Sequence, residues 1–527
     1  MKIFHIKYLL ILAVISWSCT DDFDEINTDP NAYNEIDPSF QLAKVQLDLS
    51  GKREEVWRYD LGITSSMIQH FSGSWWCQHG AQYRVVEQSH WYSLWEESYP
   101  RDAKNIQSII DATAEDPTMV NVHSAARIMK VLIYSKITDL YGDIPYSQAV
   151  KGFTEGILTP IYDSQQDIYT DFFKELDEAV KAFDDNQEAI SSDLFFDGNL
   201  DKWRRFGNSL RLRLAFRLTK VDLALAETQV KAAIAGGLMQ SNEDNATMLH
   251  SNFSYSTNEN RGNGRSQVFN ASPNSEGFRL TNTLVDFLKN TSDPRLSIYG
   301  GTYTAPKGDP TRLDVTAHLQ EGIVHGALWW NLWSDYGDLT DSDGNYVAYI
   351  PHVNKYMQPS DYVTANDAPY FHLTYAEVEM FLTEAAARGW ASDAATHWEN
   401  GIRAGMTHVG MYPGAPAISE TQITDFLAAN PLPAATEDQI RVANEQLWVI
   451  YFLNGTEAYA NYRRSGYPEL EPFTNVEWYY SGTEGVMPRR FFYPEFESQN
   501  NPANYADAIS RIGGTNNMMT PVWWDKQ

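Results

Sequence analysis

The amino-acid sequence predicts a mainly α-helical protein in which long polar loops build a separate face. Apolar residues recur every three or four positions in several blocks, which come in neighbouring pairs. These helical blocks are 41–70, 123–140, 164–183, 202–219, 374–388 and 436–453. The polar stretches between them are 240–280, 299–370 and 461–527. Because most connections in compact domains have about 4–6 residues, these stretches are expected to carry minor strands or function.

Residues suited to capping a helix stand at the start of three blocks. Ser164 stands at the start of the block 164–183. The other two begin with the spacing of a capping box, in which two side chains bond each other's backbone N–H groups: Thr374 with Glu377, and Thr436 with Gln439. Helices are therefore expected to begin close to these positions.

The composition is that of a globular protein with an acidic surface. Of its 527 residues, 43% are hydrophobic and 21% charged, and 16 Trp, 30 Tyr and 24 Phe are present. The 69 Asp and Glu against 40 Lys and Arg give a formal net charge of −29. This balance excludes a nucleic-acid partner, because binding to phosphate needs a basic surface that releases counterions. The Arg-rich segment Lys202 to Lys220 is accordingly interpreted as a scaffold helix that pairs with acidic neighbours.

The first 18 residues have the pattern of an export signal. Lys2 and Lys7 precede an apolar run, Tyr8 to Ile15, and small serines follow it. The run is too short to span a bilayer, which needs about 20 apolar residues. We therefore expect residues 1–18 to be removed on export.

Cys19 stands where a bacterial lipoprotein signal peptidase leaves the first residue of the mature chain. Ser18 fits the small position before it, whereas Ser16 replaces the Leu of the common lipobox. Each buried CH₂ of an acyl chain contributes roughly 0.8 kcal/mol, so several chains on one cysteine anchor a protein durably. We expect a lipid-anchored Cys19, a tether over 19–38 and one domain over 39–527.

Several strings resemble motifs of the SusD/RagB family of outer-membrane nutrient-binding lipoproteins. The most specific is Asp139 to Ala149 (DLYGDIPYSQA), and Asn27 to Asn31 (NTDPN) matches the tether motif of the family. Further matches follow in family order: Lys202-Trp203, Asn208 to Ala215, Arg217, Asp293 to Leu296, Tyr375 to Glu379, Asn454 to Ala458, Tyr462 to Pro468, Pro488 to Arg490, Tyr493-Pro494 and Val522 to Asp525. Each string also has a structural interpretation, so we expect these motifs to hold the fold and not to select the nutrient.

The resemblance implies a SusD-like fold, with four helix-turn-helix units similar to tetratricopeptide repeats and ligand loops on the other side. It implies an outer-membrane protein that captures an oligosaccharide and delivers it to a SusC-like, TonB-dependent transporter. The run Thr20-Asp21-Asp22 resembles the acidic signal that directs such lipoproteins to the cell exterior. RagB-like members serve peptide uptake instead, so a peptide ligand is the alternative.

Two aromatic clusters are candidates for a sugar-binding face, since flat rings stack on the C–H faces of pyranoses and Trp has few rotamers to lose. The first comprises Trp75, Trp76, Gln78 and Tyr83, in a loop bounded by Gly73 and Gly80. The second comprises Trp329, Trp330, Trp333 and Tyr336, within the stretch 299–370. Neighbouring side chains on a strand point opposite ways, so at most one Trp of each adjacent pair is expected to face a ligand. The alternative for any single Trp is packing beneath the loops.

The sequence gives little support to an enzyme. It contains no HExxH, GxSxG, GxGxxG or Walker motif. Cys77 and His79 have no further metal ligands near them in the sequence. If Cys19 is acylated, Cys77 has no cysteine left with which to form a disulfide. The run Asp341 to Asn345 does not fit a calcium-binding loop, because the apolar residues Leu339 and Ile350 would occupy its first and twelfth positions, which must supply oxygen ligands. We expect a binding protein with no cofactor or metal; a glycan hydrolase, which needs only two carboxylates, is the less favoured alternative.

Overall fold

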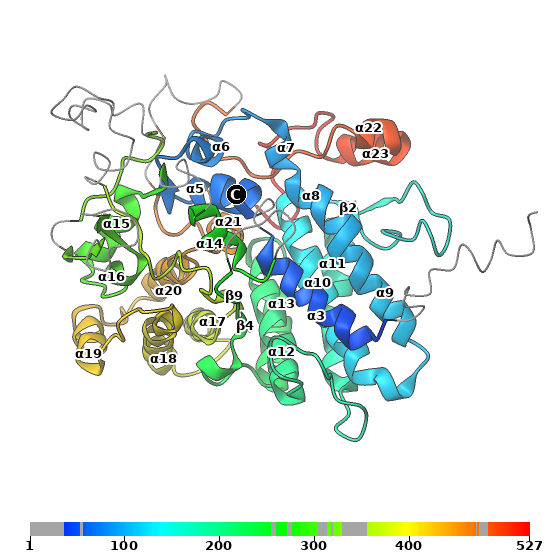
Figure 1. Ribbon diagram of the computed structural model, residues 1–527, viewed down its shortest axis with the longest axis horizontal. Helices are drawn as coiled ribbons and strands as arrows, with labels where there is room; N and C mark the ends of the chain where they lie inside the picture. Colours follow the sequence, from blue (N-terminus) through cyan, green and yellow to red (C-terminus); the bar gives the residue numbers. More distant parts are fainter. Residues whose placement is uncertain are drawn as a thin grey trace, which may run out of the picture.

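The computed structural model describes residues 36–52, 56–253, 260–270, 277–303, 313–317, 320–328, 356–470, 472–473 and 483–526. Helices pack on one another over most of the molecule, and short strands lie between them (Figure 1). The predicted mainly α-helical fold is confirmed. Within these ranges no helix is both long enough and apolar enough to cross a membrane.

The first half of the chain forms a row of long helices. These are α3 (Pro38–Gly51), α9 (Lys104–Thr113), α10 (Val120–Tyr141), α11 (Gln165–Ala182), α12 (Leu200–Arg217) and α13 (Leu223–Gly236). From α9 to α13 each helix packs on the next along the chain, and α3 packs on α9 and α10. The predicted cap is confirmed, because the Ser164 hydroxyl accepts from the Asp167 N–H at 3.1 Å.

The second half adds five helices, which lie at the lower left and centre of Figure 1. They are α17 (Tyr375–Ala387), α18 (Ala394–Thr407), α19 (Glu420–Ala429), α20 (Thr436–Ile450) and α21 (Gly455–Ser465). The Thr374 hydroxyl caps α17 by accepting from the Glu377 N–H at 3.3 Å. The capping box predicted at Thr436 is wrong. Ala435 is the N-cap residue there, and the Gln439 side chain donates to the Pro433 carbonyl at 2.9 Å.

The block 41–70 is not the single helix that its periodicity predicts. The chain leaves α3 at Lys52, enters the π-helix η1 (Trp57–Thr64) and continues into α5 (Ser65–Met67). Within η1 the buried Asp60 carboxylate accepts from the Gly455 N–H at 2.8 Å and from the Arg265 guanidinium at 2.9 Å. Both partners are remote in sequence, so a local pattern does not reveal them.

The remaining helices are short and lie mainly in connecting segments. They are η2 (Trp75–Cys77), α6 (Gln78–Ala81), α7 (Gln88–Trp91), α8 (Ser93–Glu97), η3 (Ser98–Ala103), η4 (Pro117–Met119), η5 (Leu218–Lys220), η6 (Asn242–Asp244), α14 (Gly264–Asn270), α15 (Asn282–Asn290), α16 (Leu296–Tyr299), η11 (His408–Met411), α22 (Glu497–Asn500) and α23 (Pro502–Arg511).

The strands are short and all their pairings are antiparallel. They are β1 (Phe71–Ser72), β2 (Ile144–Pro145), β3 (Tyr162–Asp163), β4 (Ala246–Met248), β5 (Arg279–Leu280), β6 (Gly300–Tyr303), β7 (Leu313–Asp314), β8 (Gln358–Pro359) and β9 (Tyr370–Leu373). Among the described residues they form four small sheets, with orders β1-β5, β2-β3, β4-β9 and β7-β6-β8. The minor strands expected in 240–280 and 299–370 are therefore present.

Buried ion pairs join the two halves of the scaffold. The Arg213 guanidinium of α12 contacts Glu377 at 2.5 Å and Glu457 at 3.4 Å, and Arg217 contacts Glu457 at 2.5 Å and Asp139 at 3.2 Å. Burial alone would raise the pKa of Glu457, but the two arginines hold it below its ordinary value. The interpretation of the Arg-rich segment as a scaffold helix is confirmed.

The signature motif of the sequence belongs to this scaffold. The Asp139 carboxylate accepts from the Tyr169 hydroxyl at 2.6 Å and from the Trp524 indole N–H at 2.9 Å. Gly142 ends α10 with φ +83°, a backbone conformation that residues other than glycine rarely adopt. Motif residues that are 385 positions apart in the chain, Asp139 and Trp524, thus meet at one buried point.

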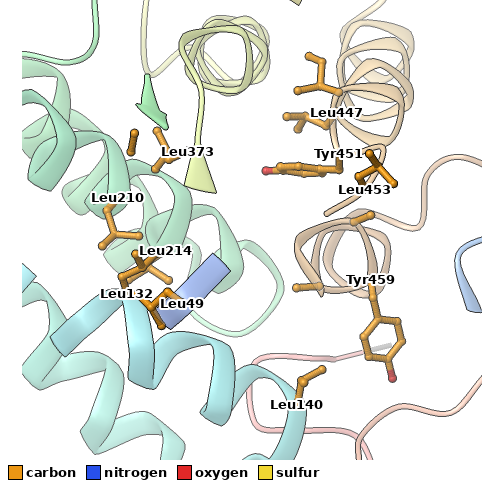
Figure 2. Close-up of a cluster of buried hydrophobic side chains, with 14 of the residues drawn as sticks. Leu49, Leu132, Leu140, Leu210, Leu214, Leu373, Leu447, Tyr451, Leu453 and Tyr459 are labelled. Carbon is orange, nitrogen blue, oxygen red and sulfur yellow. The ribbon is translucent and has the colours of Figure 1, made fainter. Parts of the chain in front are cut away.

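An apolar core surrounds these ion pairs. Figure 2 shows part of it, with Leu132 and Leu140 from α10, Leu210 and Leu214 from α12, and Tyr451 at the end of α20. All five side chains are buried. Most of the aromatic rings of the described chain take part in this kind of packing, so the few exposed ones are more informative.

Candidate functional site

The first aromatic cluster lies in a loop that begins at β1. Gly73, directly after the strand, has φ +90°, and a Cβ at this position would lie 2.6 Å from the Gly277 carbonyl oxygen. The Ser74 hydroxyl then accepts from the Trp76 N–H at 3.4 Å and caps η2. A glycine and a capping serine therefore set the direction of the chain into Trp75.

Close packing on η1 fixes the other side of the loop. A Cβ at Gly80 would lie 2.1 Å from the Ile63 carbonyl oxygen, and a Cβ at Gly62 would lie 3.1 Å from that of Trp76. Only hydrogen fits at such an approach. The backbone of the loop therefore lies directly against the π-helix at these two glycines.

The two adjacent tryptophans have different surroundings. Trp75 is 47% exposed, which is unusual for so large a ring, whereas Trp76 is partly buried. The Trp76 ring packs against Trp57, with 4.2 Å between centroids, and lies 5.9 Å from His90. Trp75 therefore offers its surface to solvent, and Trp76 supports the loop from inside.

The structure buries the other two predicted residues of this cluster. Gln78 and Tyr83 are only 2% and 3% exposed. The Tyr83 ring packs against Phe473 and His325, with centroids 5.7 and 6.1 Å apart, and burial raises the pKa of its hydroxyl. Their positions favour a structural role within the loop over the predicted ligand contact.

Two histidines hold this loop in place, and sequence reasoning singled out only one of them, His79. The His79 and His90 rings lie 4.3 Å apart, and Trp57 packs on His90 at 4.6 Å. Burial lowers the pKa of His79 to about 3, with a further contribution from His90, and burial lowers the pKa of His90 to about 4. Both rings are therefore neutral near pH 7. The only local signal for His90 was its place in an aromatic-rich run.

The second cluster lies outside the described residues, which stop at Leu328 and resume at Tyr356. This applies to Trp329, Trp330, Trp333 and Tyr336. The segment leading to this cluster is described, and it is bonded to the first cluster's loop.

Three contacts make that connection. Leu328 forms a parallel bridge with Gly73, whose N–H donates to the Ala327 carbonyl at 2.9 Å. The Gln82 amide donates to the Gly326 carbonyl at 2.8 Å. Two segments about 250 residues apart in the chain thus lie side by side at the base of the candidate face.

The described residues hold no group of three or more His, Cys, Asp or Glu that could bind a metal ion. Cys77 is fully buried, and burial raises the pKa of its thiol to about 12. A thiol with this pKa is not a reactive nucleophile at neutral pH.

Two clefts occur elsewhere on the described surface. One of about 530 Å³ lies at the signature turn, where Arg511 contacts Asp143 at 2.6 Å, and one of about 710 Å³ lies between α15, α16 and α19. Neither includes a predicted site residue. Cleft size therefore gives no independent support to the aromatic loop, and the case for that loop rests on its exposed ring.

A family model described as "Starch-binding associating with outer membrane" matches residues 30–494. The chain belongs to this SusD-like family, whose members are binding proteins associated with the outer membrane.

Solved structures give the same result. A chitin-binding protein is 35% identical, with a TM-score of 0.80, over 93% of this chain and 100% of its own. A Bacteroidetes SusD-like protein, AC2a, is 31% identical, with a TM-score of 0.82 and the same coverage. A chitin-binding SusD homolog from Flavobacterium johnsoniae shares the fold at 23% identity and a TM-score of 0.73, over 93% of this chain and 98% of its own. No protein with a curated description matches the chain.

Proposed function

We propose that the protein is a cell-surface lipoprotein that captures an oligosaccharide and delivers it to a SusC-like, TonB-dependent outer-membrane transporter. The observation that carries the proposal is the half-exposed ring of Trp75 on a rigid loop. Such a ring provides an apolar platform for a sugar at low entropic cost. The family and the two chitin-binding structures support a carbohydrate ligand.

Both aromatic clusters contribute to one face in this proposal. The pairing of Gly73 with Leu328 supports this arrangement, since it brings the segment that precedes Trp329 beside the one that precedes Trp75. We expect Trp75 and Trp330 to stack on successive sugar units. Trp76 supports the platform through its contact with Trp57.

Titration calorimetry with chito-oligosaccharides and malto-oligosaccharides tests this function. Binding of at least one series is expected, and Trp75→Ala or Trp330→Ala should weaken it by about tenfold or more. Unaltered affinity in both variants would refute the choice of site. If sugars give no heat and a peptide mixture does, the ligand is a peptide.

Chromatography of the oligosaccharides after long incubation tests the hydrolase alternative. The proposal predicts no shortened product, whereas product formation would identify an enzyme. The reaction is run with purified protein and with the Trp75→Ala variant, so that a contaminating hydrolase, which would act equally in both, is recognised.

The anchor is tested separately by membrane fractionation. We propose that residues 1–18 are removed and that Cys19 is acylated, which leaves 19–38 as the tether. Cys19→Ala should then move the protein from the outer-membrane fraction to the soluble fraction, because the acyl chains supply the membrane affinity. Cys77→Ala is the matched control and should leave the protein in the membrane fraction.

A further inference from the structure

The signature turn, Tyr141 to Asp143, lines a cleft of about 530 Å³, and a buried arginine without an anionic partner lies in the wall of this cleft. Arg490 is only 1% exposed. Its Nε donates to the Phe491 carbonyl at 3.1 Å, but among the described residues neither its Nη1 nor its Nη2 has a hydrogen-bonding partner. We call this cleft, with Arg490 in its wall, the turn cleft.

Two other buried arginines of the scaffold show what Arg490 lacks. Arg213 contacts the Glu377 carboxylate at 2.5 Å, and Arg463 donates its two Nη groups to backbone carbonyls at 2.8 and 2.7 Å. Burial of a guanidinium without such partners is unfavourable, because the charge loses its hydration and gains nothing in return. An anion in the turn cleft would supply the missing partner of Arg490.

The ring beside Arg490 offsets only part of this cost. The Arg490 guanidinium lies over the Tyr493 ring, 4.2 Å from its centroid, in a cation–π contact. Burial raises the pKa of the Tyr493 hydroxyl to about 12, so this group is neutral near pH 7 and supplies no negative charge. The same hydroxyl donates to the Asp143 carbonyl at 2.7 Å, which joins Tyr493 to the turn that lines the cleft.

The carboxylates that line the turn cleft are already paired. Asp143 contacts Arg511 at 2.6 Å, and Asp525 accepts from the Arg489 Nε at 2.7 Å. The exposed Lys526 also lines the cleft and adds a further positive charge. In a chain with a formal net charge of −29, the turn cleft is therefore a place of local positive excess.

A helix begins at the same cleft. Ser164 caps the 18-residue helix α11, and it lines the cleft together with the first two helical residues, Gln165 and Gln166. The N–H groups and the dipole at a helix N-terminus favour an anion. One of these groups already binds an anion of the protein itself, because the Gln165 N–H donates to the Asp143 carboxylate at 2.9 Å. The helix start therefore favours the same kind of ligand as the buried arginine.

We propose that the turn cleft binds a small oxyanion, a carboxylate or a phosphate group, through the guanidinium of Arg490. The planar fork of Nη donors matches two oxygens of either group. A volume of about 530 Å³ exceeds that of the anion alone, so the anionic group can belong to a larger molecule. No residue of the aromatic loop lines this cleft, so the site is independent of the proposed capture of sugar.

Titration calorimetry of the purified protein with sodium phosphate and with sodium acetate tests the inference. Chloride keeps the ionic strength constant, because charged contacts are screened by salt. Saturable binding of one anion per protein molecule is expected. Binding of phosphate alone, of acetate alone or of both identifies the group that the cleft accepts, whereas the absence of saturable heat with either anion would overturn the inference.

Arg490→Met tests the role of the guanidinium. Methionine keeps an unbranched side chain but removes the charge and its donors, so the affinity for the anion should fall by about tenfold or more. The thermal midpoint in anion-free buffer should change little, since no ion pair is lost. An unchanged affinity in the folded variant would contradict the proposal.

A pair of charge reversals decides the question even if Arg490→Met does not fold. Lys526→Glu places a negative charge at the cleft and should weaken binding by about threefold or more. Lys104→Glu makes the same change of net charge at an exposed position of α9 and should bind as the wild type does. An equal loss in both variants would show a general effect of charge and overturn the site.

Trp75→Ala separates this site from the aromatic loop. The variant should bind the anion with the wild-type affinity, because Trp75 does not line the turn cleft. Loss of anion binding in this variant would place the anion at the aromatic loop and contradict the inference.

Discussion

The helical scaffold and the aromatic loop are held in opposite ways. In the scaffold, α10 to α13 and α17 to α21 bury regular apolar stripes, and ion pairs such as Arg213 with Glu377 join helices from both halves. The aromatic loop contains only the short helices η2 and α6, and it is held by backbone contacts to η1 and to residues 326–328. Its largest exposed group is the Trp75 ring, which is 47% exposed.

This difference separates stability from recognition. Substitutions at the buried charges of the scaffold are expected to change the free energy of unfolding and to leave the affinity of the folded protein unchanged. Substitutions at the aromatic loop are expected to change affinity first. Variants that violate this division would show that the two regions are coupled.

The largest effect is expected for Arg213→Glu. Arg213 is almost fully buried between Glu377 and Glu457, so reversal places three carboxylates together without solvent. Breaking a buried pair costs about 3–5 kcal/mol, so the variant should melt far below the wild type or fail to fold. Thermal melting followed by circular dichroism measures this.

Arg211→Glu is the matched control on the same helix. Arg211 pairs with Asp177 at 3.0 Å, and the two side chains are 11% and 36% exposed. Because this pair is less buried than that of Arg213, and pairs that reach solvent contribute about 0–1 kcal/mol, the midpoint should fall much less than in Arg213→Glu. A normal midpoint for Arg213→Glu together with lost sugar binding would reverse our assignment of α12 to the scaffold.

An intermediate effect is expected where the loop meets η1. Gly80→Ala introduces a Cβ 2.1 Å from the Ile63 carbonyl oxygen, and overpacking of this kind typically costs about 1–3 kcal/mol. The loop must shift to relieve the contact, so sugar affinity should also fall. Calorimetry and denaturant unfolding measure the two effects.

Gly410→Ala is the control, since no heavy atom lies within 4 Å of the position that a Cβ on Gly410 would take, and its φ is not positive. It should be neutral or stabilising by less than about 1 kcal/mol. An unchanged affinity and midpoint for Gly80→Ala would show that the loop is not seated on η1 in solution.

The smallest effect concerns pH. Burial lowers the pKa of His70 from 6.5 to about 3, and its hydrogen bond to the Trp448 carbonyl offsets only part of this shift. The unfolded chain therefore binds a proton that the folded protein does not, and stability is lost as the pH falls from 6.5 toward 3. Each such histidine contributes about 1.4 kcal/mol per pH unit in this window.

Denaturant unfolding at pH 7, 6 and 5 tests this prediction. His70→Gln retains a side-chain donor but does not titrate, so the decline in its unfolding free energy should be shallower than that of the wild type. Equal slopes for the two proteins would show that His70 is not buried as a neutral group.

The scaffold could be predicted from the sequence because its signals are local. Apolar spacing and the cap at Ser164 located α11 almost to the residue. The block 41–70 is an exception, because it breaks into three elements. The buried Asp60 within it bonds Gly455 and Arg265, and no periodicity within the block contains that information.

The candidate face could be predicted only in part. Aromatic composition pointed to the loop around Trp75, but it did not distinguish the exposed ring of Trp75 from the supporting ring of Trp76. Gln78 and Tyr83 are buried by segments that join the loop from elsewhere in the chain. Exposure depends on such tertiary contacts, which a linear pattern does not specify.

Two tryptophans of opposite role test the separation of stability from recognition most directly. Trp524 is fully buried and donates to Asp139 at 2.9 Å, whereas Trp75 is 47% exposed. Oligosaccharide affinity and thermal midpoint should be measured for Trp75→Leu and Trp524→Leu side by side. We predict that Trp75→Leu loses affinity at an unchanged midpoint, and that Trp524→Leu lowers the midpoint at an unchanged affinity of the folded protein. A lowered midpoint with full affinity for Trp75→Leu would contradict the account.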